Sequence, residues 1–264
     1  MSALTQRVHH ALIVGASSGL GRMAGDGLSA VGIALSTVGR RPSGIAGAWH
    51  FGAAALGAVD WSGVYEEAER RAELPLDAIV YVAGDAVFGK AAQVPALRAR
   101  AVFEENFWAP AAAALSAQML WQGASRRATF VSVSSISARR AIPFEAHYCA
   151  SKAACARFLD ALQLEHPEER IRFVSVYPGR LRTAFRAKAH WYGLPPDPAP
   201  QEGSDPAHVV RAILGVLAGR RPAPAIGVRE RAIDAVDRLD SRLYDRLVLA
   251  PRVRSALRRS SRVH

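Results

Sequence analysis

Residues 11 to 21 read ALIVGASSGLG, a short apolar run followed by three glycines within seven positions. The apolar run predicts a buried strand, and the apolar spacing after Gly19 predicts a helix. A tight turn between them favours a residue without a Cβ. Backbone amides at a helix N-terminus can also hold a phosphate group when no side chain blocks its approach. The stretch therefore predicts a strand, a turn and a helix that bind the pyrophosphate of a dinucleotide.

Apolar runs alternate with stretches of helical spacing along most of the chain. Strands separated by helices of ten or more residues favour a parallel sheet with helices on both faces, which makes this an α/β protein. We predict one domain over residues 1–228, with any site at the carboxyl ends of the strands. The later strands are expected at 33–39, 53–60, 76–84, 128–135 and 171–179, and helices at 96–122, 145–165 and 205–219. No element is expected in 182–204, which contains four prolines, and a loop of that length is usually functional or mobile.

Composition limits the classes of protein that this chain can belong to. Of its 264 residues half are apolar, yet no window holds the run of about 18 apolar residues that a membrane span requires. The N-terminus runs into the glycine-rich turn and has no cleavage-site pattern, so we expect a cytoplasmic protein. Cys149 and Cys155 lack the spacing of zinc ligands or of a disulfide framework. We therefore expect buried thiols and no metal.

The positive charge is concentrated near the C-terminus. The formal net charge is +11, and residues 220–264 carry twelve arginines against five acids. Apolar residues recur there at helical spacing, which predicts a basic helical extension over 229–264, solvated or facing another subunit. Contact with an anionic membrane surface is the less favoured alternative, and no nucleic acid is expected as a partner.

A tyrosine and a lysine stand four residues apart in HYCASK, residues 147–152. The chain has only three lysines against 31 arginines, so Lys152 calls for an explanation. On a helix Tyr148 and Lys152 share a face, and a nearby cation typically lowers a phenol pKa by ~1 to 3 units, which would make Tyr148 a general acid or base. A compact ammonium can also bond two ribose hydroxyls. The pair alone also fits a tyrosine at the core edge beside a solvated lysine.

These motifs together resemble the short-chain dehydrogenase/reductase family. The resemblance rests on Gly-x-x-x-Gly-x-Gly at 15–21, on Tyr-x-x-x-Lys, and on a strand that ends at Ser135, thirteen residues before Tyr148. It covers about residues 8–228. It implies a Rossmann-type fold and hydride transfer between a nicotinamide cofactor and a carbonyl or secondary alcohol. The chain departs from the family pattern at Val14, where threonine is usual, and at Tyr81-Val82, where Asn-Asn is usual.

The resemblance also implies a catalytic set of four residues. Ser135 would donate a hydrogen bond to the substrate oxygen, whereas Ser134 would point to the other face of its strand. Tyr148 would be the general acid or base and Lys152 would hold the ribose. Asn106 would hold a water that links Lys152 to solvent, although an asparagine four residues before a proline also fits a helix irregularity.

Further residues are assigned to the cofactor. The second strand ends in Gly39-Arg40, without the acid that would hold free ribose hydroxyls, so NADP(H) is expected over NAD(H); a surface arginine is the alternative. Asp60 resembles the family's adenine contact, and a helix N-cap is the other interpretation. By resemblance the remaining contacts are Gly15, Ser17, Ser18, Gly19, Leu20, Gly21, Ala83, Gly84, Tyr148, Lys152, Pro178, Gly179 and Thr183.

The substrate is less defined than the reaction. An aromatic set favours an apolar or bulky compound, although the same side chains fit equally well as packing of the loop onto the sheet. A catalytically silent NADP(H) sensor or scaffold is the alternative function. Family resemblance implies a homodimer or homotetramer built on the helices at 96–122 and 145–165. The candidate substrate residues are Phe144, His147, Phe185, Trp191 and Tyr192.

Overall fold

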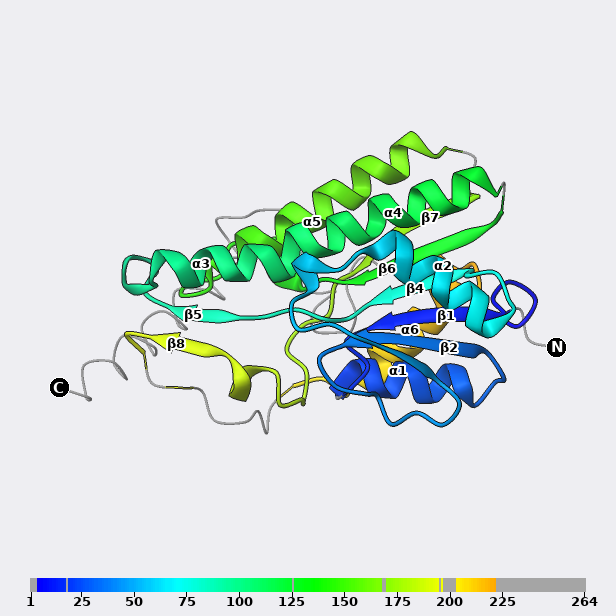
Figure 1. Cartoon of the computed structure of the whole chain (residues 1–264). Helices are drawn as coiled ribbons and strands as arrows, with labels where there is room; N and C mark the ends of the chain where they lie inside the picture. The colour runs from blue at the N-terminus through cyan, green and yellow to red at the C-terminus, as the bar shows by residue number, and fades with distance from the viewer. Residues whose placement is uncertain are drawn as a thin grey trace.

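Six parallel strands form the central sheet, in the order β3-β2-β1-β4-β6-β7 (Figure 1). The computed structural model describes residues 4–17, 19–124, 126–167, 170–194, 196 and 203–221, so Ser18 and the extension 229–264 lie outside the described residues. The strand order reverses between β1 and β4, which is where α/β sheets open a crevice at their carboxyl ends. The strands are β1 His10–Val14, β2 Ala34–Gly39, β3 Trp49–Gly52, β4 Ala78–Tyr81, β6 Ala128–Val133 and β7 Ile171–Val176.

Helices cover both faces of the sheet, as predicted (Figure 1). Side chains alternate along β1: Ala11 and Ile13 join the core beneath α1 and α6, while Leu12 and Val14 join the core beneath α2, α4 and α5. The doubly wound α/β prediction is confirmed. The α-helices are α1 Gly19–Ser29, α2 Trp61–Ala72, α3 Ala96–Phe103, α4 Ala109–Gly123, α5 Ala146–Glu165 and α6 Ala207–Leu217.

The strand expected at 53–60 is wrong. The third strand is β3, which lies before that segment, and 53–60 contains the short 3-10 helix η1, Leu56–Ala58. Alanine and glycine dominate the segment and have low strand propensity, whereas Trp49 and Phe51 are aromatic and pair beside β2. An apolar run of small residues therefore misled the strand prediction.

The segment 182–204 contains structure that the sequence did not indicate. A 3-10 helix, η5 Arg186–Lys188, precedes the strand β8 His190–Tyr192, which pairs in parallel with β5, Val87–Gly89. Figure 1 shows this pair beyond the carboxyl ends of the main strands. Three-residue strands are too short for side-chain periodicity to reveal. The pairing places the loop over the end of the sheet where a site was predicted.

Tyr81 fills the place of the family's first asparagine with an aromatic ring. Its side chain is fully buried, 6.1 Å from the ring of Trp61 and 6.3 Å from that of Phe130 between ring centroids. Among the described residues its hydroxyl has no hydrogen-bond partner. Aromatic packing therefore supports the centre of the sheet here, where the family usually has polar side chains.

Candidate active site

The glycines after β1 bring three backbone segments into contact. Gly15 has φ +91°, and a Cβ there would lie 2.8 Å from the backbone nitrogen of Ala83. A Cβ on Gly21 would lie 2.2 Å from the carbonyl oxygen of Gly15. The turn is thus packed against the end of β4 and the first turn of α1, as a pyrophosphate cradle at a helix N-terminus requires. Ser17, Gly19 and Leu20 lie in the same turn and helix start.

Three predicted residues converge beside β4. A Cβ on Gly84 would lie 2.8 Å from Asn106 Oδ1 and 3.0 Å from Lys152 Nζ, so a side chain larger than hydrogen would displace both groups. Lys152 is 6% exposed, and its ammonium donates to the carbonyl of Val133 at 3.2 Å. Burial lowers the pKa of Lys152 below the usual lysine value. The ammonium of Lys152 therefore lies in the protein interior, where water solvates a positive charge poorly.

Asn106 lies in a π-helical turn between α3 and α4. The turn η3, Glu104–Trp108, contains a bond from the Ala109 amide to the Glu104 carbonyl, and Pro110 has no amide to continue the α-helical ladder. The predicted helix irregularity is confirmed. The same turn aims the side chain into the site.

The amide of Asn106 is bonded on both of its polar atoms. Its Oδ1 accepts from the Asp85 amide at 2.9 Å, and its Nδ2 donates to the Asp85 carbonyl at 2.8 Å. Nδ2 also lies 3.0 Å from the Ser151 hydroxyl. These bonds fix the segment after Gly84 against α5. The role of Asn106 in holding a water stays a prediction.

Ser135 and Tyr148 meet at the end of β6. Ser135 accepts a hydrogen bond from the Ser137 amide at 3.1 Å, and its hydroxyl bonds the phenol of Tyr148. Burial raises the pKa of the phenol well above its usual value, and the charge of Glu145 raises it further. The Ser135 bond and Arg186 act in the opposite direction. The expectation of a lowered phenol pKa is wrong for this structure, because burial outweighs the lowering contributions of Ser135 and Arg186.

Two charged residues of the site escaped the sequence analysis. Glu145 is 9% exposed; it accepts from the Ser137 hydroxyl at 3.0 Å and forms an ion pair with Arg186 at 3.0 Å. Glu145 stands three residues before Tyr148, a helical spacing that offered a usable signal. Arg186 lies in the segment with no expected element, and nothing in its surrounding sequence marks it.

Aromatic rings surround the phenol. The Phe88 centroid lies 5.8 Å from that of Tyr148, the Phe185 centroid lies 6.2 Å from it, and Trp191 lies 4.9 Å from Phe88. Phe88, on β5, was not predicted. The loop residues Phe185 and Trp191 therefore pack beside the catalytic candidates, which fits loop packing and a substrate wall alike.

The other three substrate candidates are Phe144, Tyr192 and His147. The first two accept hydrogen bonds from backbone amides of the β5 segment through their carbonyls. Phe144 has φ +67°, rare for a residue other than glycine, and its carbonyl accepts from the Gly89 amide at 2.8 Å. The carbonyl of Tyr192 accepts from the Lys90 amide at 3.2 Å. His147 is half-buried at the start of α5.

Two further cofactor candidates, Arg40 and Asp60, lie at the end of β2 and at the start of α2. Arg40 is exposed directly after β2, and its charge reaches Glu105, whose pKa it lowers against a larger raising effect of burial. Asp60 caps α2, accepting from the Gly63 amide at 3.1 Å, so the N-cap interpretation is confirmed and its expected place at a strand end is wrong.

The Pro-Gly segment after β7 lies against the serine end of β6. The carbonyl of Pro178 accepts from the Ile136 amide at 2.9 Å, directly after Ser135. Gly179 follows, and the hydroxyl of Thr183 accepts from the Phe185 amide at 3.5 Å. These residues therefore border the candidate site from the side of the loop.

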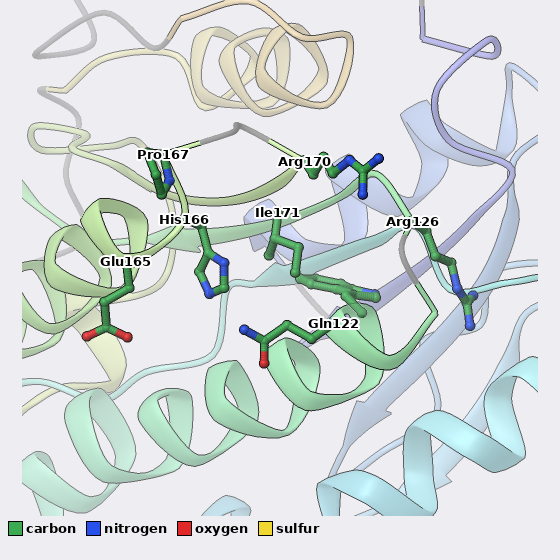
Figure 2. Close-up of a pocket in the computed structure, with 8 residues that line it drawn as sticks. Gln122, Arg126, Glu165, His166, Pro167, Arg170 and Ile171 are labelled. Carbon is green, nitrogen blue, oxygen red and sulfur yellow. The ribbon is translucent and has the colours of Figure 1, made fainter.

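A cavity of about 290 Å³ lies elsewhere (Figure 2). It opens between the C-terminal ends of α4 and α5, beside Ile171, where β7 begins. Because Ser135 follows the carboxyl end of the neighbouring strand, the cavity is at the opposite end of the sheet from the candidate site. Its lining residues are Trp121, Gln122, Arg126, Glu165, His166, Pro167, Arg170 and Ile171.

Two classes of site are absent from the part of the chain that the structure describes. No group of three or more histidine, cysteine, aspartate or glutamate side chains there could hold a metal ion. None of the helices in the described ranges has the length and apolar character to cross a membrane. Cys149 and Cys155 are buried as free thiols, as expected.

Sequence comparison identifies relatives over most of the chain. An uncharacterized oxidoreductase of Myxococcus xanthus is 31% identical over 188 residues, 67% of this chain and 74% of the relative. The uncharacterized oxidoreductase YxnA of Bacillus subtilis is 27% identical over 176 residues, 65% of this chain and 49% of the relative. Dehydrogenase/reductase SDR family member 7B of Bos taurus is 30% identical over 146 residues, 50% of this chain and 44% of the relative. The chain spans about half the length of the last two.

Solved structures share the fold. A short chain dehydrogenase of Burkholderia cenocepacia in complex with NADP has a TM-score of 0.77 at 21% identity, covering 94% of this chain and 99% of its own. A 3-ketoacyl-(acyl-carrier-protein) reductase of Brucella melitensis with NADH has a TM-score of 0.68 at 20% identity, covering 83% and 96%. The sequence pattern of the short chain dehydrogenases matches residues 9–191. The chain therefore belongs to the short-chain dehydrogenase/reductase family of NAD(P)-dependent oxidoreductases.

Proposed function

We propose that this protein transfers hydride between NADP(H) and a carbonyl or secondary alcohol, with Tyr148 as general acid or base. The observation that carries the proposal is one convergence at the carboxyl ends of β1, β4 and β6. There the glycine turn, the Ser135–Tyr148 contact and the buried ammonium of Lys152 lie at one edge of the sheet. Such an edge is where doubly wound folds bind dinucleotides.

The residues present fit a nicotinamide dinucleotide. The turn that holds Gly15 and Gly21 lies at the N-terminus of α1, where a pyrophosphate would bind, and Lys152 offers a buried donor for the ribose. When bound, the nicotinamide supplies or accepts the hydride. Ser135, whose hydroxyl proton is directed to Ser137 in this structure, would turn that proton to the substrate oxygen and stabilise the negative charge that develops there. Tyr148 donates a proton to that oxygen in reduction and removes it in oxidation.

The environment of the phenol sets its resting state. Because burial raises the pKa of Tyr148, the protonated phenol is the resting form at neutral pH. The protonated phenol can donate to the substrate oxygen, although the raised pKa also makes it a weaker acid than a solvated tyrosine. The aromatic rings around Tyr148 support an apolar or bulky small-molecule substrate.

Two adjacent serines offer a matched test of the proposed chemistry. Ser134 and Ser135 are neighbours at the end of β6, but among the described residues the buried hydroxyl of Ser134 has no hydrogen-bond partner. Ser135→Ala should reduce kcat/KM about 100-fold, because it removes one donor to the developing oxyanion. Ser134→Ala should leave kcat/KM within about twofold. The measurement is NADPH consumption against ketones, aldehydes, quinones and steroids.

The outcomes of that experiment separate the alternatives. Equal activity in the two variants would remove Ser135 from the mechanism. NADPH binding by the wild type without turnover on any compound would favour the silent sensor or scaffold.

Arg40 supports the preference for NADP(H). It follows β2, the strand whose end usually contacts the adenosine ribose, and the sequence there, Gly39-Arg40-Arg41, has no acid to hold free ribose hydroxyls. Arg40→Ala should raise KM for NADPH about tenfold, with KM for NADH unchanged, because only NADPH has the 2′-phosphate. Arg70→Ala, at an exposed arginine on α2 that pairs with Glu67, is the control for charge. An equal rise of both KM values would show that Arg40 does not discriminate between the cofactors.

Assembly and location complete the proposal. Exposed apolar side chains on α3, η3, α4 and α5 support a homodimer or homotetramer, as the family resemblance implies. The cytoplasmic location and the role of the extension 229–264 stay predictions. The exposed apolar residues are Leu97, Trp108, Leu115, Met119 and Leu164.

A further inference from the structure

A continuous set of polar contacts leads from the candidate serine to the loop over the site. Ser135 donates to the Ser137 hydroxyl at 3.2 Å, and Ser137 donates to Glu145 Oε2 at 3.0 Å. The other carboxylate oxygen of Glu145 pairs with Arg186 Nη1 at 3.0 Å. A carboxylate can only accept, so Glu145 fixes the direction of the Ser137 hydroxyl and holds the guanidinium with its second oxygen. Glu145 thus joins three segments that are separate in the sequence.

Arg186 also anchors the loop by stacking. Its guanidinium carbon lies 4.2 Å from the ring centroid of Phe88 and 5.3 Å from that of Trp191, within the range of a cation–π contact. Phe88 and Trp191 lie opposite each other in the β5–β8 pair. The ion pair with Glu145 therefore ties this small sheet to the start of α5, one turn before Tyr148.

We propose that Glu145 and Arg186 form a positioning pair, which holds the hydroxyl oxygen of Ser135 in place through Ser137 and holds the β5–β8 loop against Tyr148 during the reaction. The inference rests on the proposed function and adds two residues to it. Neither residue is a proton donor or acceptor in the chemical step.

The pair has a second, electrostatic effect on the phenol. The charge of Glu145 raises the pKa of Tyr148, whereas the charge of Arg186 lowers it. Ser135 and Cys149 are the other groups that act on the phenol, with opposite signs. Because the two charges oppose each other, removing one leaves the other uncompensated in a poorly solvated site. Single substitutions should therefore shift the phenol pKa in opposite directions.

The test compares Glu145→Gln, Arg186→Met and the double variant. Each single variant should lose about 10- to 100-fold in kcat, because a displaced catalytic group costs about that much. In the oxidative direction the rate rises as Tyr148 loses its proton. We expect Glu145→Gln to move that rise to lower pH and Arg186→Met to move it to higher pH. The double variant should restore the wild-type pH profile but not kcat.

The control is Glu67→Gln, which removes the same charge from an exposed ion pair with Arg70 on α2. It should change neither the rate nor the pH profile. A wild-type profile in both single variants, or shifts of the same sign, would overturn the proposal even if kcat falls, because loss of local structure alone predicts no opposite shifts.

A second readout does not need turnover. Hydrogen exchange of peptides that span 183–192 should be faster in Glu145→Gln than in wild type, with α1 unchanged, because the loop loses an anchor. Unchanged exchange in that segment would contradict the anchoring role. If no substrate turns over in wild type, the proposed function fails while this readout still decides whether the pair holds the loop.

Discussion

Tyr148→Phe is expected to reduce turnover about 1000-fold or more while leaving NADPH binding within a few-fold of wild type. The phenol is the only group that the proposal assigns to proton transfer, and such transfer typically contributes ~10²- to 10⁴-fold to the rate. The ring itself stays, so its packing against Phe88 and Phe185 is retained. The measurements are single-turnover NADPH oxidation with an accepted substrate and NADPH binding by fluorescence.

Folding stability should change little in this variant. The hydroxyl contributes one hydrogen bond, to Ser135, worth about 1 kcal/mol at most. Tyr81→Phe is the matched control, because it removes a buried hydroxyl that has no partner among the described residues. Full activity in Tyr148→Phe would refute the assignment of Tyr148. Equal losses in both variants would point to altered packing.

Lys152→Met is expected to reduce turnover by a similar factor without lowering the melting temperature. Lys152 is 6% exposed, and burying a cation costs several kcal/mol in proteins. Its single bond to the Val133 carbonyl contributes only about 1.5 to 3 kcal/mol, as bonds of charged groups do. Methionine fills much of the same space without the charge, so Tm should stay equal or rise while NADPH binding and turnover fall. A variant that is more stable than wild type but inactive is expected when a residue that destabilises the fold is required for activity.

The pH dependence of that stability difference provides a further check. Burial lowers the pKa of Lys152 in the folded protein, so the unfolded chain binds this proton more tightly. Between the lowered pKa of Lys152 in the folded protein and its pKa of about 10.4 in the unfolded chain, only the folded protein has lost the proton. The free energy of unfolding of wild type therefore increases as pH rises through this interval. The Tm advantage of Lys152→Met should shrink over that interval. Lys90→Met, at an exposed lysine, should show no such trend. A constant difference across pH would contradict the buried, charged state.

The sequence by itself determined the features that depend on local pattern. Residues 11–21 predicted strand, turn and helix because glycines there serve a backbone geometry that few other residues adopt. The long helices at 96–122 and 145–165 were visible because many turns repeat one apolar spacing. Tyr148 and Lys152 were paired by their helical spacing, and Ser135 was assigned through the family resemblance, which places a serine thirteen residues before the tyrosine. The contact of Ser135 with Tyr148 and the burial of Lys152 followed once those elements folded.

Only the tertiary structure decided what depends on contacts between distant segments. The β5–β8 pair joins two three-residue strands about a hundred positions apart, and no periodicity marks either of them. The Glu145–Arg186 pair likewise spans 41 positions. The direction of the Tyr148 pKa shift depended on burial, which the Tyr-x-x-x-Lys spacing does not report. Spacing along one helix determines which side chains share a face. The solvation of those side chains and the charges near them depend on the segments that the fold packs against that face, and these set the direction of a pKa shift.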